Sequence, residues 1–279
     1  MILKNTLFIT AFFLAPLALH AQPLKIVAAE NFYGGVAEQI AGPSAEVTSI
    51  LSNPNQDPHE FQSDPKTAKK VADATIIIYN GLGYDTWMEK LLGADRKSDR
   101  VIINVAQLVG AKEGSNPHLW YDPKTMPALA AKLASILHRP QSEIAFSKSM
   151  QPLIDKINKL KPKTTGIKVT ATEPVFGYMA SALGFQMLNK GYQQAIMNDA
   201  TPHFQEIVSF EKSLTDHTAQ LLFQNSQTIN PSTQRLIAIA KQNHIPVINI
   251  TETEPTSAKS YVDWMISQLE EIESSLPAK

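Results

Sequence analysis

The 279-residue chain contains no cysteine, which excludes disulfide bonds, thiolate zinc sites, iron–sulfur clusters and cysteine nucleophiles. It also lacks an excess of charge of either sign, because 25 Lys and Arg residues face 26 Asp and Glu residues. A protein that binds nucleic acid through its phosphates normally carries a basic excess, so no nucleic-acid partner is expected. Charged residues make up 18% and hydrophobic residues 43% of the chain, which is typical of a soluble globular protein. Any metal site must therefore be built from histidine and carboxylate side chains.

A hydrophobic run long enough to cross a membrane is missing from the N-terminal region. The apolar run from Leu7 to Leu19 is shorter than the roughly 20 residues of a membrane span, and Pro16 interrupts it. With Lys4 before the run and small residues after it, residues 1–21 are predicted to be a cleaved secretory signal peptide. A retained membrane anchor is the alternative. Since no cysteine can carry a lipid, we expect a freely diffusing protein without a lipid anchor, most simply in a bacterial periplasm.

What the chain does contain is an alternation of strand-like and helical stretches, repeated in two series. The first series has strand-like runs at 24–29, 45–51, 74–79 and 101–105, with helical patterns at 34–40, 64–72 and 84–92. The second has strand-like runs at 168–172, 221–225 and 247–250, with helical patterns at 176–183, 232–243 and 260–275. This alternation predicts α/β units around mostly parallel sheets.

A long helix-compatible segment separates the two series. It runs from Thr125 to roughly Leu160, apart from Arg139-Pro140, and Pro162 is expected to follow its end. We therefore expect an N-terminal lobe over residues 22–124, a helical segment with one long rigid linking helix over 125–163, and a C-terminal lobe over 164–279.

Two histidines share a sequence context that suggests a common site. His59 and His118 each follow a proline, in a loop just after a predicted strand. Open α/β sheets bind ligands in the loops at the carboxyl ends of their strands. The alternative for each histidine is a purely structural role in a turn or at a helix start.

Carboxylates occupy the equivalent places in the second half of the chain. Glu173 follows the strand 168–172, and Glu252 and Glu254 follow the strand 247–250. Helix N-capping explains Glu254 well but explains Glu173, which precedes Pro174, less well. Two imidazoles and two carboxylates from two lobes would neutralise a divalent cation, and a site without a vacant position favours capture over hydrolysis.

The other histidines are not expected to bind metal. His138 is interpreted as structural, in the linking segment, and His203, His217 and His244 as solvent-facing.

At the candidate site residues the sequence resembles the metal-specific solute-binding proteins of bacterial ABC importers, and within them the group that binds zinc or manganese. The segments that carry this resemblance are DPHEFQ (57–62), IIIYNGLGYDTWMEKLL (76–92), NPHLWYDP (116–123), ATEPVFGYMASALGF (171–185), and ITETEP (250–255) with YVDWM (261–265). The resemblance implies a metal site in the cleft between two lobes. It assigns the four ligands to His59, His118, Glu173 and Glu252, with Glu254 as the alternative fourth ligand.

The function implied by this resemblance is capture of one Zn²⁺ or Mn²⁺ ion and its delivery to the transmembrane permease of an ABC importer. We expect a monomer without enzymatic activity. The alternative is a secreted metal-dependent hydrolase, but the sequence contains neither an HExxH motif nor a GxSxG motif. An adhesin role, which some members of the family have been assigned, has no sequence feature in its favour.

Overall fold

The computed structural model describes residues 23–54, 56, 58–94, 99–198, 200–228 and 230–276, and for His59 it describes the backbone alone. The predicted signal peptide, residues 1–21, lies outside the described residues. None of the described helices is both long and apolar enough to cross a membrane.

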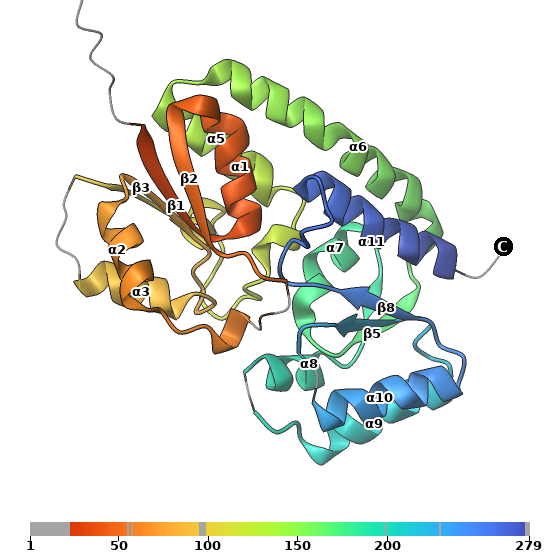
Figure 1. Cartoon of the computed structure of the whole chain (residues 1–279). Coiled ribbons are helices and arrows are strands. Elements are labelled where there is room, and N and C mark those ends of the chain that lie inside the picture. The colour runs from red at the N-terminus through yellow and green to blue at the C-terminus, as the bar shows by residue number, and fades with distance from the viewer. Residues whose placement is uncertain are drawn as a thin grey trace, which may run out of the picture.

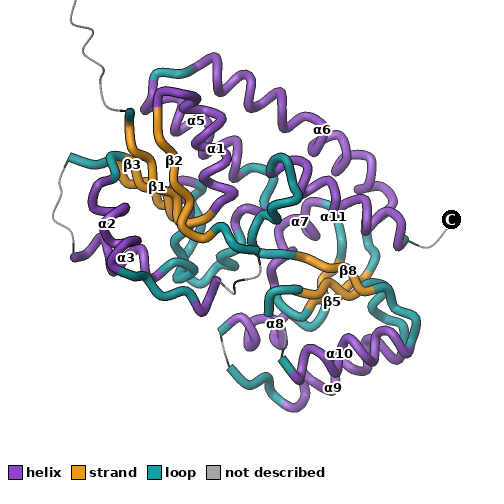
Figure 2. The backbone as a smooth tube through the Cα atoms, viewed as in Figure 1, coloured by secondary structure: helices purple, strands orange, loops and turns teal. Residues whose placement is uncertain are grey.

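The first lobe is built on a four-stranded parallel sheet (Figures 1 and 2). Its strands are β1 (Leu24–Glu30), β2 (Ala45–Leu51), β3 (Ile76–Tyr79) and β4 (Val101–Asn104), in the order β2-β1-β3-β4. Its helices are α1 (Asn31–Ala41), α2 (Pro65–Asp73), α3 (Thr86–Ala94) and the short α4 (Val105–Leu108). All four residues of β3 are buried, as expected of a central strand covered on both faces.

The second lobe repeats this plan with another four-stranded parallel sheet. Its strands are β5 (Lys168–Ala171), β6 (Gln186–Met187), β7 (Leu222–Asn225) and β8 (Val247–Ile250), in the order β6-β5-β7-β8. Its helices are α7 (Gly177–Ala182), α8 (Lys190–Met197), α9 (Phe204–Thr215), α10 (Pro231–Gln242) and α11 (Tyr261–Ser275). The order places β7 between β5 and β8, which brings together the chain segments that follow these three strands.

Two consecutive helices connect the lobes. The helix α5 (Thr125–Leu137) ends at His138, which adopts a left-handed conformation with φ of 54°, and α6 (Pro140–Thr164) follows. Figure 1 shows α6 extending from the first lobe to α11 of the second. At about 1.5 Å per residue its 25 residues span roughly 37 Å. These elements confirm the prediction of two parallel-sheet α/β lobes joined by a long helix.

The prediction that Pro162 follows the end of this helix is wrong, because α6 contains both Pro152 and Pro162. Each helical proline removes the backbone hydrogen bond from its own nitrogen to the residue four positions earlier, and α6 continues through both prolines despite this loss.

One hydrophobic cluster runs through both lobes, and each lobe has a smaller cluster of its own. The shared cluster includes Ile26 and Phe32 of the first lobe, Trp120 between the lobes, and Phe223 and Trp264 of the second. The Phe32 and Trp120 rings stack with their centroids 4.5 Å apart. The lobes therefore form one packed unit instead of two bodies on a flexible hinge.

Candidate metal centre

Three of the four predicted ligands are buried. Glu173 and Glu252 lie just beyond the ends of β5 and β8, whereas His118, expected just after a strand, lies in the segment after α4 because this short helix follows β4 directly. His118 and Glu252 are 0% exposed and Glu173 is 4% exposed. The Nε2 atom of His118 lies 3.5 Å from Oε2 of Glu252, although 134 residues separate them in the chain. Glu173 is connected to Glu252 through the amide of Asn225. The structure thus brings one imidazole and two carboxylates together between the lobes.

The orientation and the tautomer of His118 are set by Asn116. Asn116 donates through Nδ2 to the carbonyl of Pro174 (2.7 Å), so its Oδ1 must act as an acceptor. This oxygen accepts from the backbone N–H of His118 (3.1 Å) and lies 2.5 Å from its Nδ1. The proton of the neutral ring is therefore on Nδ1, and Nε2 presents a lone pair. Among the described residues, buried Nε2 makes no hydrogen bond, which is the state required of a metal ligand.

Glu173 and Glu252 share one hydrogen-bond donor. The Nδ2 atom of Asn225 lies 2.6 Å from Oε2 of Glu173 and 2.6 Å from Oε1 of Glu252. Asn225 is the last residue of β7, and the two glutamates follow the neighbouring strands β5 and β8. Sheet order therefore places this amide between two buried carboxylates, whose repulsion it reduces.

Tyr84 contacts the same group from the first lobe. Its hydroxyl donates to Oε2 of Glu252 at 3.0 Å. Burial, the charge of Glu252 and the charge of Glu30 hold the pKa of Tyr84 well above its usual value. The phenol therefore stays protonated and serves as a hydrogen-bond donor to Glu252.

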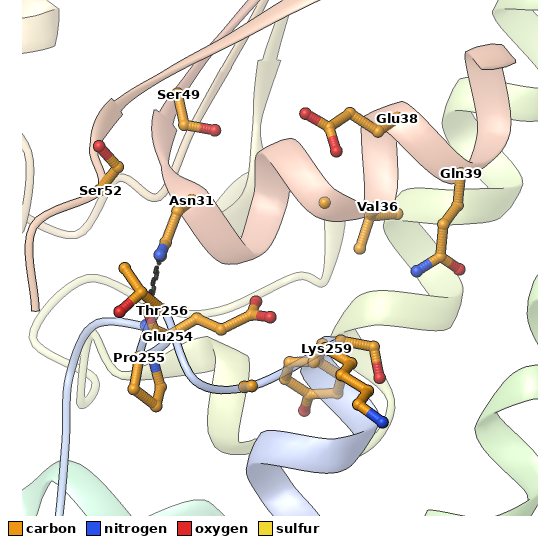
Figure 3. A pocket seen from close by; sticks show the side chains of 14 residues that line it. Asn31, Val36, Glu38, Gln39, Ser49, Ser52, Glu254, Pro255, Thr256 and Lys259 are labelled. Carbon is orange, nitrogen blue, oxygen red and sulfur yellow. Dashed lines mark hydrogen bonds between the residues drawn. The ribbon is translucent and has the colours of Figure 1, made fainter.

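Glu254, the alternative fourth ligand, faces a different part of the molecule. Its side chain lines a cavity of about 450 Å³ that Glu38 and Lys259 also line (Figure 3), and His118, Glu173 and Glu252 do not line it. The side-chain amide of Asn31 donates to the Glu254 carbonyl (2.8 Å) and accepts from the Glu254 N–H (3.3 Å). Burial and the charges of Glu38 and Asp263 raise the pKa of Glu254 to about 7.

A second amide, that of Gln227, holds the loop that carries Glu252. Its Oε1 accepts from the backbone N–H groups of Glu252 (2.6 Å) and Thr253 (2.9 Å). Its Nε2 donates to the carbonyl of Gln56 at 3.0 Å. Gln56 lies three residues before His59, whose backbone is in the 3-10 turn Pro58–Glu60. Gln227 therefore connects the two loops that carry the first and the fourth predicted ligands.

The donor chemistry fits a divalent transition metal, but the described side chains are not yet arranged around one point. Among them, no group of three His, Asp or Glu side chains is close enough to hold an ion without rearrangement. Glu173 and Glu252 are oriented by Asn225, and the side chain of His59 is outside the description. The imidazole nitrogen of His118 and the two carboxylates suit zinc and harder cations alike.

His203, His217 and His244 are exposed, as predicted, and His138 is exposed as well. His138, His217 and His244 each adopt a positive φ of 53–56°, next to the ends of α5, α9 and α10. His203 precedes the first residue of α9.

Three residues of the centre, Asn116, Asn225 and Tyr84, were not expected from the sequence. Asn225 could have been found by the rule that pointed to Glu173, since both stand at strand ends. Asn116 belongs to the NPH segment but was considered only as the neighbour of His118. No local signal identified Tyr84, because its contact with Glu252 spans 168 residues.

The two lobes, the bridging helix and the polar group buried between them define a two-lobed α/β fold with a candidate metal centre between its lobes. The chain belongs to the family described as "Zinc-uptake complex component A periplasmic", which matches residues 26–275.

Curated relatives support this assignment. The manganese ABC transporter substrate-binding lipoprotein PsaA of Streptococcus mitis is 28% identical over 191 residues, which cover 60% of this chain and 62% of PsaA. The chain thus matches about three fifths of the length of that relative. The manganese-binding lipoprotein MntA of Bacillus subtilis is 25% identical over 242 residues, which cover 79% of this chain and 77% of MntA.

Solved structures show the same fold. The periplasmic zinc-binding protein TroA from Treponema pallidum superimposes with a TM-score of 0.77 at 15% identity. The match covers 92% of this chain and 100% of TroA. A crystal structure of ZnuA gives a TM-score of 0.73 at 18% identity, with 92% of this chain and 100% of ZnuA covered.

Proposed function

We propose that this protein captures one Zn²⁺ or Mn²⁺ ion outside the cytoplasm and delivers it to the transmembrane permease of an ABC importer. The ion is the transported substrate, and its ligands are His59, His118, Glu173 and Glu252. The observation that carries the proposal is the buried Nε2 of His118, which makes no hydrogen bond among the described residues and lies 3.5 Å from a buried carboxylate oxygen. Such an arrangement is costly unless a cation joins the two groups.

Electrostatics supports capture of a divalent ion. Two neutral imidazoles and two carboxylates balance a charge of +2, so the loaded centre is neutral and can remain buried. Glu252 is preferred to Glu254 as the fourth ligand because its carboxylate faces His118, whereas Glu254 lines a separate cavity.

The location and the assembly state belong to the same proposal. We propose a monomer in the periplasm that presents its metal-bearing face to the permease. The curated relatives are named as lipoproteins, whereas this chain contains no cysteine. A role in binding, not catalysis, is proposed because the alternative hydrolase lacks a recognisable motif and no comparison supports it.

Competition titration of Zn²⁺ against a chromophoric chelator tests the ligand set. His118→Ala and His59→Ala should each weaken Zn²⁺ binding by about 100-fold or more, because each removes a direct ligand. His138→Ala is the matched control, since this exposed histidine only ends α5. Unchanged affinity in His118→Ala would refute the assignment.

The paired variants Glu252→Gln and Glu254→Gln decide the fourth ligand. Loss of one carboxylate from the centre should weaken binding strongly in the first variant and only slightly in the second. The reverse order would place the ion beside Glu254.

A further inference from the structure

Asn225 is held in one orientation by its surroundings. Its side chain is buried, since the residue is 2% exposed. Its Oδ1 accepts from the backbone N–H of Gln227 at 3.1 Å, so its Nδ2 must face the carboxylates. Its own backbone N–H donates to Oγ1 of Thr172 at 3.1 Å, which ties the end of β7 to the segment after β5. Turning the amide over would place its oxygen against two carboxylates and leave the Gln227 N–H unpaired.

This orientation engages one oxygen of each glutamate. Asn225 binds Oε2 of Glu173 and Oε1 of Glu252, while the other oxygen of Glu252, Oε2, is the one near Nε2 of His118. An ion that bound both oxygens of Glu252 would compete with the Asn225 bond. Each carboxylate is therefore predisposed to offer a single oxygen.

We propose that Asn225 is a metal-selectivity residue, which holds Glu173 and Glu252 to one-oxygen coordination and so favours Zn²⁺ over Mn²⁺. This inference rests on the proposed function, since it concerns the same metal centre. One nitrogen from each of two histidines and one oxygen from each of two carboxylates make four ligands. Zn²⁺ is commonly satisfied by four ligands in a tetrahedron.

Mn²⁺ loses more than Zn²⁺ from this restriction. Mn²⁺ is typically coordinated octahedrally by six ligand atoms, mostly oxygen, and the four ligand atoms counted above do not complete this sphere. The missing positions would have to come from second carboxylate oxygens or from water. The second carboxylate oxygens are already hydrogen-bonded to Asn225. Access of water is restricted because His118, Glu173 and Glu252 are buried. The amide thus adds to the general preference of such sites for zinc over manganese.

The test compares the wild type with Asn225→Leu, which keeps the number and the branching of the side-chain heavy atoms and removes both hydrogen bonds to the carboxylates. Titrations with Zn²⁺ alone and Mn²⁺ alone give the ratio of the Mn²⁺ Kd to the Zn²⁺ Kd. This ratio should fall by about tenfold in Asn225→Leu. Tyr84→Phe is the matched control. It also removes a hydrogen bond to Glu252, but this bond is made to Oε2, the oxygen that faces His118, and not to the oxygen that Asn225 binds. It should weaken the binding of both ions in parallel and leave the ratio unchanged.

Substitution with Co²⁺ reports coordination number directly and needs no variant. Four-coordinate Co²⁺ absorbs visible light far more strongly than six-coordinate Co²⁺, so the wild type should show the intense spectrum and Asn225→Leu a weaker one. A weak, six-coordinate spectrum in the wild type overturns the inference, even if the variant does not fold. An unchanged Kd ratio together with an unchanged Co²⁺ spectrum in folded Asn225→Leu also overturns it. If the wild type binds neither Zn²⁺ nor Mn²⁺, the proposed function itself fails.

Discussion

A single uncharged residue, Asn116, orients the side chain of the proposed metal ligand His118. Its amide is oriented by the Pro174 carbonyl, so its oxygen faces Nδ1 of His118 and directs the lone pair of Nε2 into the centre. Residues of this kind do not touch the ion, yet they decide whether a ligand is ready for it.

Asn116→Ala should weaken Zn²⁺ binding by about 10- to 100-fold, because the imidazole is then free to rotate and to change tautomer. Asn116→Asp keeps an acceptor oxygen for Nδ1 and should bind Zn²⁺ far better than the alanine variant. Chelator competition measures both affinities. Equal binding by Asn116→Ala and the wild type would show that His118 is oriented by other contacts.

A second residue-scale feature is the buried carboxyl pair Glu30 and Asp85. Burial and the nearby Asp85 charge hold the pKa of Glu30 well above its usual value. Burial raises the pKa of Asp85 from 3.8 to about 6. The hydrogen bonds that the backbone N–H groups of Gly81 and Asn80 donate to its carboxylate lower this pKa, but by less than burial raises it. Because both folded pKa values exceed the unfolded ones, the folded state binds more protons. The contribution of these two groups to the free energy of unfolding is therefore greatest below about pH 4. It is lost as pH rises through their folded pKa values.

Glu30→Gln should flatten this pH dependence, because a neutral amide cannot ionise and still offers Asp85 a donor. Relative to the wild type, the variant should gain free energy of unfolding as pH rises from 5 to 8. Urea denaturation across this range measures the effect, and parallel curves for the two proteins would contradict it.

At the scale of elements, the loop after β8 is held by amides from both lobes. Asn31 at the start of α1 binds the backbone of Glu254, and Gln227 after β7 binds the backbone of Glu252 and Thr253. Gln227 also reaches the carbonyl of Gln56 in the loop before His59. The two loops that carry the proposed ligands His59 and Glu252 are therefore coupled through one side chain.

Gln227→Ala should loosen both loops while leaving the strands intact. We expect faster hydrogen exchange in residues 251–254 and faster release of Zn²⁺ to an excess of chelator, because two backbone N–H groups lose their acceptor. Asn31→Ala is the matched control, since Asn31 contacts the same loop without reaching Gln56. It should speed exchange at Glu254 and affect Zn²⁺ release less. Identical release rates in the two variants would argue against coupling through Gln227.

At the scale of the whole molecule, aromatic packing makes the interface between the lobes continuous. Tyr121 packs on Phe176 with centroids 5.4 Å apart and donates to the carbonyl of Thr251 at 2.7 Å. Tyr261 donates to the carbonyl of Trp120 at 2.6 Å. Separation of the lobes would break these contacts and expose the shared core.

Binding of Zn²⁺ should therefore leave the overall shape nearly unchanged. Small-angle scattering of metal-free and Zn²⁺-loaded protein should give superimposable curves and equal radii of gyration, because closely packed interfaces do not deform gradually. Hydrogen exchange should localise the response to the loops near residues 59, 118 and 252. A clear decrease in radius on loading would instead indicate hinge closure.

Much of the architecture could be predicted because its signals are local. The buried run of β3, the strand 45–51 and the closing helix after Ser260 each have a hydrophobic pattern that determines the element type. The short strand β6 and the helices α8 and α9 were not predicted; two residues and eight residues carry too little periodicity in the case of β6 and α8. The error at Pro162 has another origin, because a proline marks a probable helix end and α6 continues through it.

The sequence by itself determined which chemistry is available: without cysteine, imidazole and carboxylate are the side chains expected to hold a metal. His118 follows a proline in a loop, and Glu173 and Glu252 stand just after predicted strands. Tertiary structure alone decided which of these groups meet. The order β6-β5-β7-β8 places Asn225 between Glu173 and Glu252, and packing of the lobes brings Tyr84 and His118 to the same carboxylate. The physical reason is that strand order and lobe packing depend on contacts between residues far apart in the chain, whereas periodicity and turn chemistry report only on neighbours.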